Sequence, residues 1–186
     1  MRMTLLAATT ALFLTACGST APSKPPAPEV PKVSTAKQAV ANLASASGSL
    51  VSGKITAVPM GDGVHLTGTV GGLPPNSSHG FHVHEKGDCS AADASSAGPH
   101  FNPFGTAHGK AETGAHHAGD MDNVAANAEG VVAVDVHVKG VTLGGGAVND
   151  IAGRALIVHA APDDYSSQPA GNAGARVACG IITVTQ

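Results

Sequence analysis

Apolar and polar side chains alternate along several short stretches of the chain. The clearest stretch is 132–139, in which four valines alternate with Ala133, Asp135, His137 and Lys139. Because successive side chains of a β-strand point to opposite faces, this alternation predicts a strand with one buried face. Weaker versions of the pattern, separated by turn-forming glycine and proline, predict further strands at 38–45, 50–58, 64–70, 79–84, 155–159 and 177–184. We expect about eight strands and no amphipathic helix.

The composition supports an all-β domain. The 186 residues include 24 glycines, one tyrosine and no tryptophan, and only 12% of them are charged. Short strands joined by turns suit such a glycine-rich chain, and its length allows one domain, which we place at 36–186. The expected fold class is therefore an all-β sandwich or barrel. The formal net charge of −3 gives no indication of a nucleic-acid partner.

Two segments do not fit the strand pattern. Residues 85–122 are rich in glycine, serine and alanine and hold four of the ten histidines, and residues 162–175 form the second segment. Long irregular loops in a compact domain usually serve a function, so we expect two long functional loops.

The N-terminus has the features of an export signal. An apolar run at 5–14 is too short to span a bilayer and ends in the sequence Leu-Thr-Ala-Cys at 14–17, which resembles the lipobox of bacterial lipoproteins. We expect a lipoprotein signal peptide at 1–16, lipidation of Cys17 and a flexible tether up to residue 35. The lipid would anchor the protein to a membrane outside the cytoplasm, in the periplasm or cell envelope. The alternative is an ordinary cleaved signal peptide with an incidental cysteine.

Two further cysteines, Cys89 and Cys179, remain if Cys17 is lipidated. Two thiols in an exported protein usually form a disulfide, which here would close a loop of about 90 residues. Two separate buried thiols are the alternative.

Histidine is unusually frequent, since the ten histidines equal the lysines and arginines in number. His82 and His84 are two residues apart on one predicted strand, so both imidazoles project from the same face, opposite Phe81 and Val83. Surface strands also carry such a pair by chance, and the pair indicates a metal only when other ligands join it.

The first loop and the end of another strand provide those ligands. A set of three nitrogens and one oxygen, of the kind that zinc accepts, comprises His100, His108, His117 and Asp120. A set of four imidazoles, which favours copper(II), comprises His82, His84, His100 and His159. His100 belongs to both sets because a deprotonated imidazole can bind one metal through each nitrogen.

Five segments, four of which contain residues of these two sets, occur in a distinctive order and spacing. They lie at 79–85, 97–103, 117–120, 158–159 and 171–176. They closely resemble motifs of the copper/zinc superoxide dismutase family, and the resemblance extends over 36–182. It implies an eight-stranded Greek-key β-barrel, copper and zinc as cofactors, superoxide as substrate, and His100 as the bridge between the two metals.

The resemblance also implies roles for residues outside the two ligand sets. Arg176 takes the position of the active-site arginine, and Cys89 and Cys179 take the positions of the family's disulfide. Asp163 fits the family's bridging carboxylate better than Asp164 does. Its implied partners are one copper-ligand histidine, His82, and one zinc-ligand histidine, His108.

The implied reaction is dismutation of superoxide to dioxygen and hydrogen peroxide by copper redox cycling. His100, supported by zinc, would take up a proton and deliver it to the peroxide, and Arg176 would orient the substrate. The second loop is short and has no lysine, whereas eukaryotic members use charged residues there to guide the substrate, so steering would come from Lys86 or Lys110, or be weaker. Lys86 also replaces an apolar residue of the eukaryotic dimer contact, which leaves the oligomeric state open.

Two other functions are compatible with parts of the pattern. A metal-binding or copper-delivery module would typically lack a ligand or the arginine, whereas this chain has all of them. A zinc hydrolase would need an open zinc position, whereas the zinc-type set is closed. Of the remaining histidines, we expect His65 and His137 on the surface, His79 in a structural hydrogen bond and His116 beside the ligand His117 without binding metal.

Overall fold

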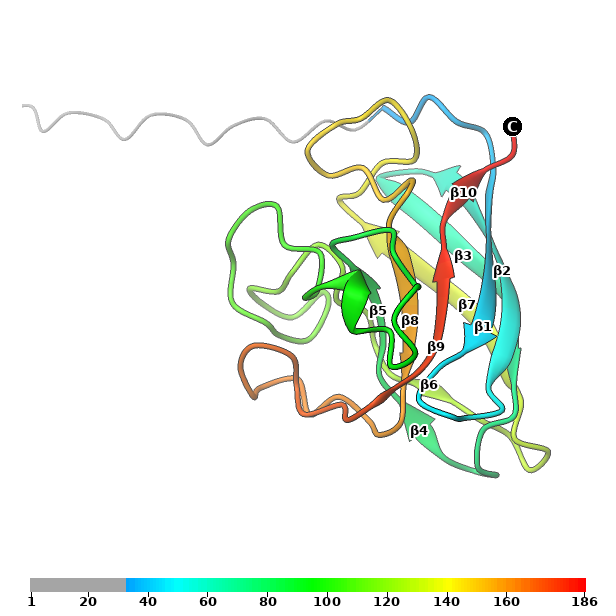
Figure 1. The fold of residues 1–186 in the computed structure, drawn as a ribbon. Coiled ribbons are helices and arrows are strands. Elements are labelled where there is room, and N and C mark those ends of the chain that lie inside the picture. The colour runs from blue at the N-terminus through cyan, green and yellow to red at the C-terminus, as the bar shows by residue number, and fades with distance from the viewer. Residues whose placement is uncertain (1–32) are drawn as a thin grey trace, which may run out of the picture.

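The computed structural model describes residues 33–186, which fold almost entirely into β-strands (Figure 1). The strands are β1 (Ala39–Ser45), β2 (Ser52–Met60), β3 (Gly63–Gly71), β4 (Ser78–His79), β5 (Phe81–His84), β6 (Val124–Ala125), β7 (Val132–Lys139), β8 (Ala155–His159), β9 (Arg176–Ile181) and β10 (Thr183–Val184). A 3₁₀ turn, η1 (Ser95–Ala97), is the one helical element of this region. No helix among the described residues is both long and apolar enough to cross a bilayer. The signal peptide, Cys17 and most of the tether lie outside the described residues.

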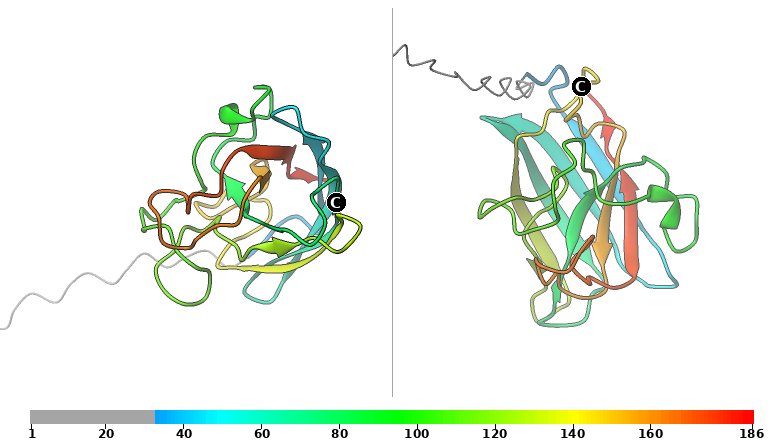
Figure 2. Two further views of the ribbon diagram at one scale, coloured as in Figure 1. Left: turned by 90° about the horizontal axis from the view of Figure 1, so that it is seen from below. Right: turned by 90° about the vertical axis from the view of Figure 1, so that its left-hand side faces the viewer.

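Eight of the strands form one antiparallel sheet in the order β5-β8-β9-β1-β2-β3-β7, in which β10 also pairs with β1. The chain runs through β1, β2 and β3 as neighbours, crosses to β5 at the far edge, returns to β7 beside β3, and crosses again to β8. These crossings make a Greek key, and the end-on view in Figure 2 shows the sheet curled around its core. The prediction of an all-β Greek-key barrel or sandwich is confirmed.

The core follows the alternation of the sequence. In β7, Val132, Val134 and Val138 are buried while Ala133 and Asp135 face solvent. Each buried valine or leucine contributes about 1.5–3 kcal/mol relative to exposure, so the apolar face sets the register of the strand.

Strands β5 and β8 differ because every residue in both is buried. One face of each strand packs in the core. The other face is covered by the two long loops, which lie on the same side of the sheet in Figure 1. This double burial places the histidines of β5 and β8 between the sheet and the loops.

The outer edge of β5 is closed by the first loop rather than by another strand. The N–H of Val83 donates to the oxygen of Gly119, and the N–H of Phe101 donates to the oxygen of Val83, both at 2.9 Å. The loop thereby satisfies the backbone groups that an edge strand leaves free. The prediction of a continuous strand at 79–84 was wrong at Gly80, because the N–H of Gly80 donates to Ala161 outside the ladder and divides the segment into β4 and β5.

Candidate metal centre

The first group of ligands comes from two adjacent strands and the first loop. Phe81 and Val83 are fully buried in the core, so His82 and His84 project from the opposite face of β5. β5 pairs with β8, whose last residue is His159, and the ring of His159 lies 5.0 Å from that of His82. His100 arrives from the loop, with its ring 4.1 Å from that of His82. Ligand nitrogens of these four residues lie within 4.8 Å of one another.

The second group gathers around one carboxylate. Asp120 accepts a hydrogen bond of 2.8 Å from Nδ1 of His100 and another of 2.8 Å from the backbone N–H of His117. Nδ1 of His108 and Nδ1 of His117 lie 3.0 and 3.3 Å from the same carboxylate without hydrogen-bonding to it. All four residues are buried, and the structure brings together the same set that the sequence predicted.

In the first group, the hydrogen bonds that the rings donate leave unprotonated ring nitrogens whose lone pairs face one another. His84 Nδ1 donates to the Gly98 oxygen and His159 Nδ1 donates to the Gly174 oxygen. Their Nε2 atoms, 3.3 Å apart, are therefore both acceptors. His82 Nδ1 and His100 Nε2 also have no hydrogen-bond partner. Such a set of buried, unsatisfied nitrogens fits a soft or borderline cation such as copper.

Burial keeps the rings of His84 and His159 neutral. It lowers the pKa of His84 from 6.5 to about 2 and the pKa of His159 to about 3. In the second group, burial alone would raise the pKa of Asp120, but hydrogen bonds from His100 and from the N–H of His117 hold that pKa well below its ordinary value. Three imidazole nitrogens and one carboxylate make a donor set that fits zinc.

Asp163 joins the two groups. One of its oxygens accepts from His82 Nε2 at 2.9 Å and the other accepts from His108 Nε2 at 3.0 Å. Burial would raise the pKa of Asp163, but these bonds hold that pKa below its usual range. The neighbouring Asp164 instead binds exposed loop residues. Gly171, at φ +65°, allows this approach, because a Cβ there would overlap the Asp163 carboxylate.

Two side-chain amides, which the sequence analysis missed, fix this arrangement. Gln168 accepts from the N–H of His108 and donates to its oxygen, both at 2.9 Å. Asn123 makes the same pair of bonds with the N–H and oxygen of Asp163, at 2.8 and 2.9 Å. Both clamps connect the first long loop to the second. No sequence pattern distinguishes these amides from other polar loop residues.

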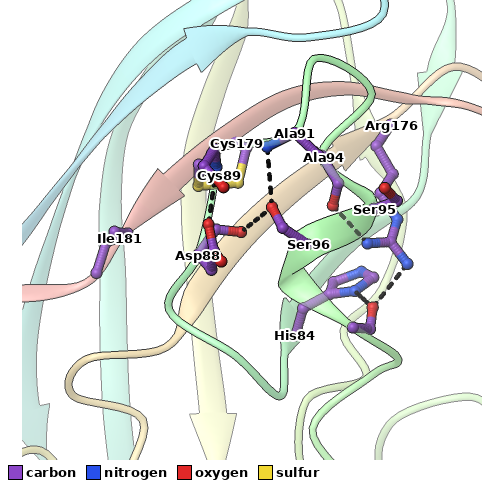
Figure 3. Close-up of a disulfide and its surroundings, with 12 residues drawn as sticks. His84, Asp88, Cys89, Ala91, Ala94, Ser95, Ser96, Arg176, Cys179 and Ile181 are labelled. Carbon is purple, nitrogen blue, oxygen red and sulfur yellow. Dashed lines mark hydrogen bonds between the residues drawn. A yellow bond between two sulfur atoms is a disulfide. The ribbon is translucent and has the colours of Figure 1, made fainter.

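The predicted disulfide between Cys89 and Cys179 is confirmed, with Cα atoms 5.8 Å apart (Figure 3). Arg176, on the same strand as Cys179, donates from Nη1 to Ala94 at 2.7 Å and from Nη2 to Gly98 at 2.6 Å. The Gly98 oxygen also accepts the bond from His84. The loop closed by the disulfide therefore holds both the arginine and a histidine of the first group.

A cleft leads from the surface to this centre. It is lined by His84, His100 and His159 together with Arg176, as well as by residues of both long loops. Neither Lys86 nor Lys110 lines it, and Lys110 instead lies 5.4 Å above the ring of Tyr165.

The other histidines lie outside both groups. His79 is buried and uses Nδ1 and Nε2 for bonds to the oxygen of His159 and the hydroxyl of Ser77, at 2.8 and 2.6 Å. His65 and His137 lie partly exposed on the outer face of the sheet beside Asp135 and Asp62. The ring of His116 bonds to the main-chain oxygen of Gly114, two residues before it.

Comparison with known proteins gives one consistent result. The family model for copper/zinc superoxide dismutase (SODC) matches residues 51–182. A protein named superoxide dismutase [Cu-Zn] 2 from Aquifex aeolicus (strain VF5) is 43% identical over 148 residues, which is 78% of this chain and 86% of that protein. Superoxide dismutase [Cu-Zn] 1 from the same organism is 44% identical over 133 residues, which is 70% of this chain and 79% of that protein.

Solved structures agree with the sequence comparisons. The clock protein EA4 superposes with a TM-score of 0.72 at 39% identity, covering 82% of this chain and 98% of that chain. A SOD-like protein from Bacillus subtilis superposes with a TM-score of 0.70 at 37% identity, covering 77% of this chain and 97% of that chain.

Proposed function

This chain belongs to the copper/zinc superoxide dismutase family, and we propose how its own residues carry out the dismutation of superoxide with copper and zinc. His82, His84, His100 and His159 would hold the copper, and His100, His108, His117 and Asp120 would hold the zinc. The observation that carries this assignment is the position of His100 in both groups. Its Nδ1 is directed at Asp120, while its Nε2 has no hydrogen-bond partner.

Copper, when bound, supplies the one-electron chemistry by which one superoxide is oxidised to dioxygen and a second is reduced to hydrogen peroxide, while zinc is redox-inert. The second half of the reaction consumes two protons. His100 is suited to supply one of them, because its Nε2, which has no hydrogen-bond partner, could carry the proton while Nδ1 on the other side of the ring would be held by the zinc-type group.

The remaining residues orient the ligands and the substrate. Asp163 accepts from the outer nitrogens of His82 and His108, which fixes the tautomer and direction of both rings. The two bonds from Arg176 to main-chain oxygens hold its guanidinium at the wall of the cleft, where its charge attracts and orients superoxide.

Metal analysis and superoxide consumption of the purified protein test this proposal together. We expect stoichiometric copper and zinc, and rapid dismutation that is lost when copper is removed and returns when copper is added. In the His159→Ala variant, copper binding and activity should be lost while zinc remains, because His159 belongs only to the first group. A protein that binds zinc alone, or both metals without consuming superoxide, would contradict the proposal.

We also propose that the protein is exported and anchored to a membrane through a lipid on Cys17. The lipobox-like sequence before this cysteine and the tether after it support the proposal. Superoxide crosses membranes poorly because it is charged, so an anchored enzyme would act on superoxide that arises outside the cytoplasm. Cell fractionation tests this. The native chain should sediment with membranes and the Cys17→Ser variant should not, whereas identical fractionation of the two would refute the anchor.

A further inference from the structure

Among the residues that the structure describes, two arginines and no lysine line the cleft that leads to the metal centre. The arginines are Arg154 and Arg176, and Glu85 is the acidic residue of the lining. The chain as a whole carries a formal charge of −3, so its average field repels superoxide. Attraction of the anion therefore depends on cationic groups inside the cleft.

Arg154 is held in place by neutral partners. Its Nε donates to the main-chain oxygen of Asp150 at 2.7 Å, and its Nη1 donates to the main-chain oxygen of Glu85 at 2.6 Å. The guanidinium lies 3.6 Å from the centre of the Phe101 ring. These contacts orient the arginine without pairing it directly with a carboxylate, and the charges of Asp150 and Glu85 act on it from beyond ion-pair distance.

The nearby carboxylate of Asp150 has other partners. It accepts hydrogen bonds from the N–H groups of Gly144, Gly146 and Ala152. No ion pair involves Arg154 in the part of the chain that the structure describes. In contrast, Lys139 on the outer face of the sheet is 2.7 Å from Glu112, which neutralises it.

Arg154 also contacts two residues that directly follow histidines of the first group. Glu85 follows His84 directly, and Phe101 follows His100. Its positive charge is thus fixed on the wall of the cleft, close to the chain segments that present the copper-site histidines, and adds to the charge of Arg176.

We propose that Arg154 is a steering residue of this enzyme, which concentrates superoxide in the cleft and compensates for the absence of lysine in the second loop. The inference rests on the proposed function, since it assumes that superoxide enters this cleft. Two fixed positive charges in a cleft with walls of low dielectric raise the local concentration of a small anion more than the same charges on an open surface would.

Arg154 has structural contacts as well, so the test must separate the effect of its charge from the effect of those contacts. Charge attraction weakens with ionic strength, because the screening length falls from about 30 Å at 0.01 M to about 3 Å at 1 M salt. Loss of a structural contact lowers the rate by the same factor at every salt concentration. The salt dependence of the rate therefore distinguishes the two roles.

The experiment compares four metal-loaded proteins of verified copper and zinc content: the wild type, Arg154→Gln, Arg154→Lys and Lys54→Gln. Lys54 is the matched control, because it is exposed on β2, which is separated from β5 by three strands in the sheet order. The second-order rate constant for superoxide is measured from low to high ionic strength. A titration with azide, a small anion that is not consumed, gives a binding constant for the same cleft.

We expect Arg154→Gln to react roughly two- to fivefold more slowly than wild type at low ionic strength and at the same rate at high ionic strength. Its azide affinity should fall by a similar factor, also only at low salt. Arg154→Lys should keep most of the rate, and Lys54→Gln should follow the wild-type curve.

A deficit of Arg154→Gln that is the same at all salt concentrations would overturn the steering role, and so would the absence of any deficit. Either result leaves the proposed function intact as long as the wild type consumes superoxide. A wild type loaded with both metals that does not consume superoxide would instead refute the proposed function.

Discussion

At the scale of single residues, the metal centre depends on side chains that do not bind metal. Gln168 has one acceptor and one donor directed at the two main-chain groups of His108, so the peptide of a zinc-site histidine is fixed from the opposite loop. Each such bond contributes about 1 kcal/mol net, and the pair together about 2 kcal/mol. This energy favours the conformation that presents His108 to the second group.

Replacing Gln168 should therefore weaken zinc binding more than copper binding. In Gln168→Ala, loss of about 2 kcal/mol of orientation corresponds to roughly a tenfold to thirtyfold lower zinc affinity. Copper affinity should change little, because Gln168 contacts none of the histidines that belong to the first group alone. Competition with a chelator for each metal measures both values.

Two further variants make this measurement specific. Gln168→Glu keeps an acceptor for the N–H of His108 but loses the donor, so its zinc affinity should lie between those of wild type and alanine. Ser166→Ala is the control from the same loop, since its hydroxyl bonds only to the exposed Asp164. Equal losses of zinc and copper affinity in Gln168→Ala would show that the residue supports the whole domain rather than the zinc site.

The sequence predicted the metal ligands far better than it predicted the side chains that hold those ligands in place. His82 and His84 could be assigned to one face because strand alternation fixes the direction of side chains. Gln168 and Asn123 could not be identified, because their roles depend on the contact between two loops whose residues are 40 to 60 positions apart. The same reason hides Arg154, whose partners Glu85 and Phe101 belong to another part of the chain.

At the scale of elements, the segment from β5 to η1 acts as one unit with β9. Arg176 is bonded to Ala94 and Gly98 on either side of η1, and Ala94 and Ala97 pack with Cys179 in a small apolar cluster. The disulfide to Cys89 closes this unit covalently (Figure 3). It thus connects the strand that carries the arginine to the loop that orients it.

Breaking the disulfide should reduce activity under conditions in which the barrel is still folded. The loop closed by Cys89 and Cys179 spans 90 positions, and opening it costs about 4–5 kcal/mol of stability on the chain-entropy model. In Cys89→Ser, at full metal loading and below its lower melting temperature, the loop is freer and Arg176 less well placed. We expect a severalfold lower rate with superoxide.

Far-ultraviolet circular dichroism and metal analysis of the same samples establish that the variant is folded and loaded. Full activity in a folded, loaded Cys89→Ser protein would show that the hydrogen bonds and apolar contacts of the loop suffice to place Arg176. The alanine cluster alone would then account for the position of the loop.

The elements themselves were predictable to different degrees. The ranges 132–139 and 155–159 coincide with β7 and β8, since an apolar pattern of that length leaves little choice of register. β6 has two residues and was not predicted, because two residues show no period. The break at Gly80 depends on the bond from its N–H to the oxygen of Ala161, a partner that only the folded chain brings there.

At the scale of the whole molecule, the histidine centre makes the metal-free protein sensitive to acid. His84 and His159 are buried and neutral, with pKa values of about 2 and about 3 against 6.5 for a free ring. In the unfolded chain both rings bind protons once the pH falls below about 6.5. In the folded protein they do not until the pH approaches 3. The unfolded state therefore binds more protons across this window, and the stability of the fold decreases as the pH falls.

The free energy of unfolding of the metal-free protein should therefore change measurably with pH. Each of the two rings should lower the free energy of unfolding of the metal-free protein by up to about 1.4 kcal/mol for each pH unit below 6.5. Urea denaturation of the metal-free protein at several pH values between 7.5 and 4.5 gives this free energy. In His159→Gln this dependence of the free energy of unfolding on pH should be weaker by up to about 1.4 kcal/mol per pH unit, the contribution of one proton. His116→Gln changes a ring outside both groups and should keep the wild-type dependence. A stability that stays constant across this range, or the same slope in His159→Gln as in wild type, would mean that the buried rings open to solvent before they take up protons. In that case the centre would be preorganised by its metals rather than by the fold.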